Sequence, residues 1–98
     1  MANTTWETLT RRRLELVQTA AAHKARNLRV FGSVVRGEDG PDSDIDFLVD
    51  FAPDASLLDL IGLQQDLETL LGRRVDVVTP AGISQFLHDR VLQEARPL

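Results

Sequence analysis

The segment Ile45–Phe51 constrains the fold more than any other part of the 98-residue sequence, because its apolar and polar residues alternate with the period of a β-strand. One face of such a strand is entirely apolar and comprises Ile45, Phe47, Val49 and Phe51. The other face is mostly acidic and comprises Asp44, Asp46, Leu48 and Asp50. A strand of this kind needs neighbouring strands and a second layer that covers its apolar face.

Helical patterns lie on both sides of this strand. Before it, an imperfect apolar stripe predicts a helix from about Thr5 to Lys24. After it, Ser56 is expected to cap a second helix, and Gly72 fits the left-handed position just beyond the helix end. We expect the inner face of this second helix to comprise Leu57, Leu60, Ile61, Gln64, Leu67, Leu70 and Leu71. A last helix is predicted over Ile83–Glu94, with inward residues Phe86, Leu87, Val91 and Leu92.

Two more strands complete the pattern. The first is Leu28–Phe31, which ends at Gly32, and the second is Arg73–Thr79, which is rich in valine. Residues 37–43 include two glycines and a proline, which predicts a loop. The order of helices and strands predicts an α/β fold in which helices pack against a mixed sheet of three or more strands. The length fits a single domain that spans residues 1–98.

The composition excludes several classes of protein. A net charge of −4 argues against direct nucleic-acid binding, which usually needs a basic surface, but it suits divalent cations or a basic protein partner. The absence of cysteine excludes disulfides and thiolate zinc sites. No apolar run reaches the roughly 20 residues of a membrane helix, and the N-terminus lacks the basic and apolar regions of a signal peptide. We therefore expect a cytoplasmic protein.

Gly32 and Ser33 follow a predicted strand and form a candidate phosphate site. A glycine lets a phosphate approach the backbone closely, and Ser33 offers a hydroxyl and an N–H group where a short helix can begin. The same two residues also suit an ordinary turn. Neither the Walker A pattern nor the dinucleotide-binding glycine pattern is present.

Asp44 and Asp46 form a candidate metal site, because residues two apart in a strand point to the same face. Two carboxylates so close repel each other unless a cation lies between them. The alternative is a solvated acidic loop edge. A calcium-binding EF-hand is excluded, because Phe47 and Pro53 occupy the positions where that motif needs glycine and glutamate.

Asp76 is the candidate third carboxylate. It is the only acidic residue in the predicted strand Arg73–Thr79, and its alternation with Val75 and Val77 places it on the polar face. A neighbouring strand could bring it beside Asp44 and Asp46. The alternative is an ordinary half-exposed aspartate.

Taken together, these residues resemble a known family. The spacing Gly32-Ser33-(x)10-Asp44-x-Asp46, with Arg36-Gly37 after the first pair and Ser43 before the second, is similar to the polymerase β-like nucleotidyltransferase superfamily. The whole chain most resembles the minimal nucleotidyltransferases that act as antitoxins of HEPN-type toxins. The similarity includes Asp76 and the closing segment 94–98, whereas Val35 departs from the small residue that many relatives have.

The resemblance implies an enzyme and assigns roles to these residues. Gly32, Ser33 and Arg36 would bind the triphosphate of ATP, and Asp44, Asp46 and Asp76 would be catalytic and hold two Mg²⁺ ions. AMP would be transferred to a hydroxyl, such as that of a tyrosine, on a HEPN-type toxin with which the chain forms a hetero-oligomer. Two alternatives stay open: a non-catalytic antitoxin that acts by binding, and a nucleotidyltransferase that acts on a small molecule or RNA.

Overall fold

A computed structural model of the chain describes residues 4–98, which contain a four-stranded sheet. The strands are β1 (Ala25–Phe31), β2 (Ile45–Phe51), β3 (Val75–Val78) and β4 (Arg96–Pro97), and their order across the sheet is β3-β2-β1-β4. β2 runs parallel to β3, whereas β1 is antiparallel to both β2 and β4. The predicted α/β fold with a mixed sheet is therefore confirmed.

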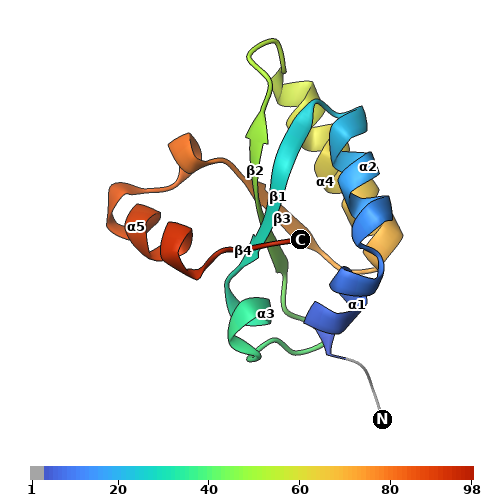
Figure 1. Cartoon of the computed structure of the whole chain (residues 1–98), viewed down its shortest axis with the longest axis vertical. Helices are drawn as coiled ribbons and strands as arrows, with labels where there is room; N and C mark the ends of the chain where they lie inside the picture. The colour runs from blue at the N-terminus through green and yellow to red at the C-terminus, as the bar shows by residue number, and fades with distance from the viewer. Residues whose placement is uncertain (1–3) are drawn as a thin grey trace.

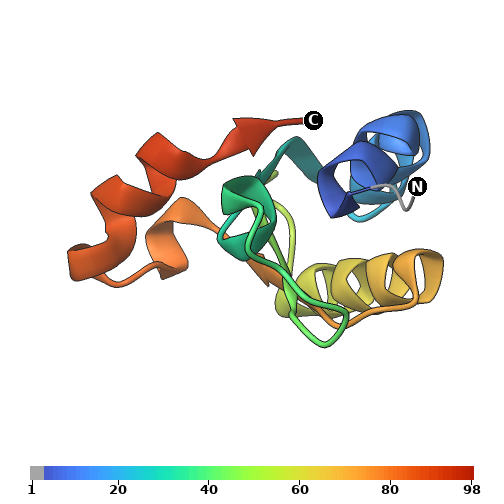
Figure 2. The same ribbon diagram turned by 90° about the horizontal axis from the view of Figure 1, so that it is seen from below.

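The helices lie on both sides of the sheet. Helices α1 (Thr5–Arg11), α2 (Arg13–Ala22) and α4 (Leu57–Leu71) cover one side, and α5 (Gln85–Glu94) lies on the other (Figure 1). The single turn α3 (Ser33–Arg36) lies between these two groups when the molecule is seen from below (Figure 2). No helix within residues 4–98 has both the length and the apolar character needed to cross a membrane.

The core lies between the sheet and the three helices on its covered side. Phe47 and Val49 of β2 are fully buried there and form one cluster with Leu63 and Leu67 of α4. This arrangement follows from the alternation in β2, because its apolar face must be removed from water. Leu48 is also fully buried, although it belongs to the opposite face of the strand.

Helix α4 has the ends that its sequence predicts. The Ser56 N–H donates to the Asp59 carboxylate over 2.9 Å in a capping box, which satisfies a donor that the first helical turn leaves free. Gly72 follows the last residue with a φ of 66°, a left-handed conformation that glycine adopts without a steric penalty. Local signals therefore set both ends of this helix.

The first helical region is interrupted, so the prediction of one helix from Thr5 to Lys24 is wrong. Arg12 leaves the helical conformation with φ −96° and ψ 14°, and α2 begins at the next residue. The Arg12 guanidinium donates to the Leu70 carbonyl near the end of α4 and also pairs with Glu15. The break therefore accompanies a contact between two helices, which the periodicity of one helix does not reveal.

Helices α4 and α5 bury fewer residues than expected. In α4, Leu57 is 70% exposed and Ile61 42% exposed, so these two positions were assigned inward wrongly. In α5 only Val91 is buried, whereas Phe86 is 98% exposed. Leu87 and Leu92 are also exposed. The physical reason is visible in Figure 1, where α5 stands away from the sheet and its first turns have no layer against which to pack.

The edge of the sheet beyond β1 was not predicted. β4 has two residues, one of them proline, and so provides no alternation that a sequence pattern can detect. β1 also begins at Ala25 and not at Leu28 as predicted. The sequence pattern missed its first residues because the strand contains an irregularity between Arg26 and Arg29. Asn27 has a φ of 57° at this point, which breaks the alternation of a regular strand.

Candidate functional site

The structure brings Gly32, Asp46 and Asp76 together at one end of the sheet. In the strand register, Phe31 of β1 lies opposite Asp46 of β2, and Asp46 lies opposite Asp76 of β3. Gly32 follows Phe31 directly. Because residues in register on neighbouring strands point to the same face, Asp46 and Asp76 share a face of the sheet.

Gly32 allows the turn after β1 to lie against the Asp46 carboxylate. Its φ of 79° is in the region that favours glycine, and a Cβ atom on Gly32 would lie 2.3 Å from Asp46 Oδ2. That distance is far below van der Waals contact. The side chain that requires a glycine here is therefore Asp46, whereas the sequence had suggested only the approach of a phosphate.

Asp46 carries uncompensated negative charge. Burial, together with the negative charges of Asp76 and Asp44, raises the pKa of its carboxyl from the ordinary 3.8 to about 6. Arg36 acts in the opposite direction but does not cancel the shift. A carboxyl in this situation is stabilised either by a proton or by a cation.

The stability of the metal-free chain is expected to reflect this shift. Because the folded-state pKa of Asp46 lies above its unfolded value, the folded state binds the proton more tightly, and this contribution to stability is lost as the pH rises from about 4 to 6. The Asp46→Asn variant lacks this titration. We expect its melting temperature to exceed that of the parent chain by a margin that grows between pH 4 and pH 7 in EDTA. A margin that stays constant over this range would contradict the assignment.

Asp44 lies just before β2, and its side chain is engaged elsewhere. Its Oδ1 atom is 3.2 Å from Arg74 Nε, and the Arg74 side chain is 81% exposed. Exposed ion pairs contribute little to stability, so this contact costs little to break. As the side chains stand in residues 4–98, no three acidic, histidine or cysteine residues converge on one metal position. The donor set of three carboxylates nevertheless matches the oxygen ligands that Mg²⁺ prefers.

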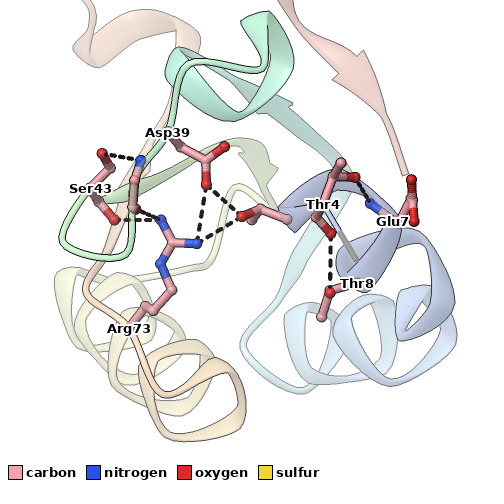
Figure 3. A network of polar contacts seen from close by, with 8 residues as sticks. Thr4, Glu7, Thr8, Asp39, Ser43 and Arg73 are labelled. Atoms are coloured by element: carbon pink, nitrogen blue, oxygen red, sulfur yellow. Dashed lines mark hydrogen bonds and ion pairs between the residues drawn. The ribbon is translucent and has the colours of Figure 1, made fainter. Parts of the chain in front are cut away.

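Arg73 holds the loop that leads to Asp44, a role that the sequence analysis missed (Figure 3). Its guanidinium donates to the Ser43 carbonyl over 2.7 Å and to the Gly40 carbonyl over 3.0 Å. It also contacts the Asp39 carboxylate at 3.3 Å and the Thr5 hydroxyl at 2.9 Å. One partly buried arginine, whose side chain is 19% exposed, thus links the loop, the start of α1 and the segment just before β3. Sequence patterns offer no signal for it, because its partners lie 30 to 68 residues away.

Glu94 is a second residue that the sequence analysis left without a role. It belongs to the last turn of α5, yet its Oε2 atom accepts a hydrogen bond of 3.0 Å from the Gly32 N–H. Its Oε1 atom accepts one of 2.6 Å from Arg36 Nη1. The Nε atom of Arg36 donates to Glu38 over 3.1 Å. Arg36 is therefore paired with two acids in the structure as it stands.

A cavity of about 500 Å³ lies near these residues but is separate from the aspartates. It is bounded by the first residues of α1, by α3 and by Arg96 of β4, and its lining includes Trp6, Arg36 and Arg73. Arg96 lies over the Trp6 ring, 5.8 Å from the ring centroid. Because none of the three aspartates lines this cavity, the chemistry that they suggest belongs to the open end of the sheet.

Comparisons with known proteins agree with this geometry. Residues 14–98 match the nucleotidyltransferase domain family. The protein adenylyltransferase MntA of Thermococcus cleftensis is 44% identical over 88 residues, which cover 82% of this chain and 89% of that protein. A solved structure assigned to the minimal nucleotidyltransferases superposes with a TM-score of 0.84 at 49% identity, covering 94% of each chain.

A crystal structure of a toxin–antitoxin with AMP-PNP also contains a similar chain. The TM-score is 0.71 at 25% identity, and the match covers 89% of this chain and 69% of that one. The fold, the spacing of the motif residues and the extent of these matches agree with one another. The chain therefore belongs to the nucleotidyltransferase domain family and is an enzyme of the minimal nucleotidyltransferase type.

Proposed function

We propose that this chain transfers AMP from ATP to a tyrosine hydroxyl of a HEPN-type toxin, in a Mg²⁺-dependent reaction that silences the toxin. The observation that carries this proposal is the register of β2 and β3, which sets Asp46 opposite Asp76 beside the Gly32-Ser33 turn. A triphosphate site and an acidic metal site then lie next to each other. The chain would act as the antitoxin of a toxin–antitoxin pair and form a complex with its partner.

Each motif residue has a role in this reaction. Gly32, Ser33 and Arg36 bind the triphosphate, and the three carboxylates of Asp44, Asp46 and Asp76 hold Mg²⁺. When bound, two such ions supply the charge that stabilises the attacking and leaving oxygens. Asp76 accepts the proton of the acceptor hydroxyl. The hydroxyl oxygen then forms a bond to the α-phosphorus while the bond to the β-phosphate breaks, and pyrophosphate leaves.

A protein partner as the acceptor is supported by four facts. The relative MntA is a protein adenylyltransferase, and the AMP-PNP complex is a toxin–antitoxin. This chain contains no tyrosine, so a tyrosine acceptor must come from another molecule. Asp76 is exposed at the end of the sheet, where a second protein can approach it. These facts favour transfer to a protein partner over transfer to this chain itself.

Intact-mass spectrometry tests the proposal directly. The chain, a HEPN-type toxin, ATP and Mg²⁺ are mixed, and the toxin is expected to gain one or more AMP units while this chain gains none. EDTA and the Asp44→Asn variant are expected to prevent the gain. Mass added only to this chain would instead indicate self-modification. If the toxin loses its activity without gaining mass, or if the Asp44→Asn variant still silences it, the non-catalytic alternative is supported. In that alternative, binding alone silences the toxin.

A further inference from the structure

The Glu94 carboxylate occupies two donors that belong to the proposed phosphate site. One of its oxygens accepts from the Gly32 N–H and the other from the Arg36 guanidinium, at 3.0 and 2.6 Å. The Glu94 side chain is only 16% exposed in this position. The Glu94 carboxylate therefore resembles a phosphate group. Two oxygens of a phosphate could accept hydrogen bonds from the same backbone N–H and guanidinium.

Glu94 is ionised in this arrangement. Burial opposes its ionisation, but the hydrogen bonds from Arg36 and Gly32 outweigh burial and hold its pKa below the ordinary value. Its negative charge also reaches Asp46 and adds to the forces that raise the pKa of that carboxyl. The proposed site thus contains a fourth acid, besides the three that the family resemblance assigns.

A nucleotide and Glu94 cannot use these donors at the same time. The triphosphate needs the Gly32 backbone and Arg36, and a fixed carboxylate between them would repel it. We propose that Glu94 is a competing anion, which holds the phosphate site in the free chain and is displaced when ATP binds. This inference rests on the proposed function, because it assumes that Gly32 and Arg36 bind phosphate.

The displacement has a structural consequence at α5. Glu94 is the last residue of α5, and the helix otherwise stands away from the sheet (Figure 1). Within α5 only Val91 is buried. Release of Glu94 therefore removes a main polar anchor between the helix and the α3 turn, and nucleotide binding is coupled to the position of α5.

Binding of ATP to the Glu94→Gln variant tests the inference. Glutamine keeps an acceptor oxygen for the Gly32 N–H but carries no charge, so Arg36 is freed for phosphate. We expect calorimetry in Mg²⁺ to show ATP binding about tenfold tighter than in the parent chain, as for one charged hydrogen bond. Inorganic tripolyphosphate is expected to show a similar gain, because the competition concerns the phosphates and not the base.

Glu38→Gln is the matched control. Glu38 pairs with the same arginine through Nε, but none of its hydrogen bonds reaches Gly32, and its side chain is 65% exposed. We expect little change in ATP affinity for this variant. Equal gains in the two variants would overturn the inference, because they would reflect only a lower negative charge near Arg36.

A purely structural role for Glu94 predicts no gain in ATP affinity. If Glu94 serves only to hold the turn in shape, Glu94→Gln weakens ATP binding or leaves it unchanged, and the inference is wrong. If the parent chain and the variant both fail to bind ATP, the proposed function and the inference are both wrong. Binding by the parent chain without a gain in the variant overturns the inference alone.

A second measurement keeps the test independent of how well the variant folds. Titration of the parent chain with tripolyphosphate, followed by NMR, is expected to shift the amide of Gly32 and the amides at the end of α5. Ala95 reports this end, because its N–H donates to the Val91 carbonyl over 2.9 Å. A shift at Gly32 with none around Ala95 would show that Glu94 stays in place, which contradicts displacement.

Discussion

Replacement of Asp46 by asparagine is expected to lower the rate of the proposed Mg²⁺-dependent AMP transfer by about 10³-fold, because a metal site contributes several kcal/mol to the stabilisation of the transition state. Asp46 is central to the site: it lies opposite Asp76 in the register and against the Gly32 turn. The measurement is the rate of AMP incorporation into the partner at saturating ATP. The variant is expected to fold, since it removes a carboxyl that the fold holds with a raised pKa.

Asp50→Asn provides the control on the same strand. Asp50 is four residues further along β2 and on the same face, but it bonds to Asn27 and Arg29, away from the Gly32 turn. Its replacement is expected to leave the transfer rate nearly unchanged. An Asp46→Asn variant that transferred AMP at the rate of the Asp50→Asn variant would show that the carboxylates at this end of the sheet do not hold the catalytic metal.

Replacement of Gly32 by alanine is the second large effect that we expect. The new Cβ atom would lie 2.3 Å from Asp46 Oδ2, so the carboxylate or the turn must move by a distance of the order of an ångström. Misplacement of that size lowers catalytic rates by about 10²-fold. The backbone conformation of Gly32, with φ 79° and ψ −151°, is also one that is essentially restricted to glycine, so alanine lowers the stability of the fold by about 1 to 3 kcal/mol.

Gly37→Ala tests whether backbone strain in the α3 turn affects activity in the absence of a contact with Asp46. Gly37 ends α3 in the left-handed conformation, with φ 71° and ψ 23°, and a Cβ atom there would meet no other atom within 4 Å. We expect Gly37→Ala to lose about 1 kcal/mol of stability in thermal denaturation and to keep its activity, whereas Gly32→Ala is expected to lose more stability and to lose activity. Equal losses of activity would mean that strain in the α3 turn, and not the contact with Asp46, controls the site.

Much of the site could be predicted from the sequence, because its residues lie in short segments with strong local signals. The alternation in Ile45–Phe51 gave the bounds of β2 and placed Asp46 on the polar face. The residue types at Gly32, Ser33 and Asp76 suggested phosphate and metal chemistry before their positions were known. The fold places Gly32, Asp46 and Asp76 at one end of the sheet, whereas the sequence indicated only that a neighbouring strand could bring Asp76 beside Asp44 and Asp46.

Other features depend on contacts between distant segments and could not be predicted. Glu94 reaches Gly32 across 62 residues, and Arg73 reaches Thr5 across 68. Phe86 was assigned to the core because helical periodicity identifies an apolar stripe, but periodicity does not tell whether another layer covers that stripe.

The sequence by itself determined the type and approximate extent of the main helices and strands and the chemistry of the motif residues, because strand alternation and helix capping act over a few neighbouring residues. The tertiary structure alone decided which carboxylates face one another, why Gly32 cannot carry a side chain, and that Glu94 closes the turn from the far end of the chain. The physical reason is that register and packing arise when the buried faces of separate elements meet, and the resulting neighbours are set by the whole fold and not by any one segment.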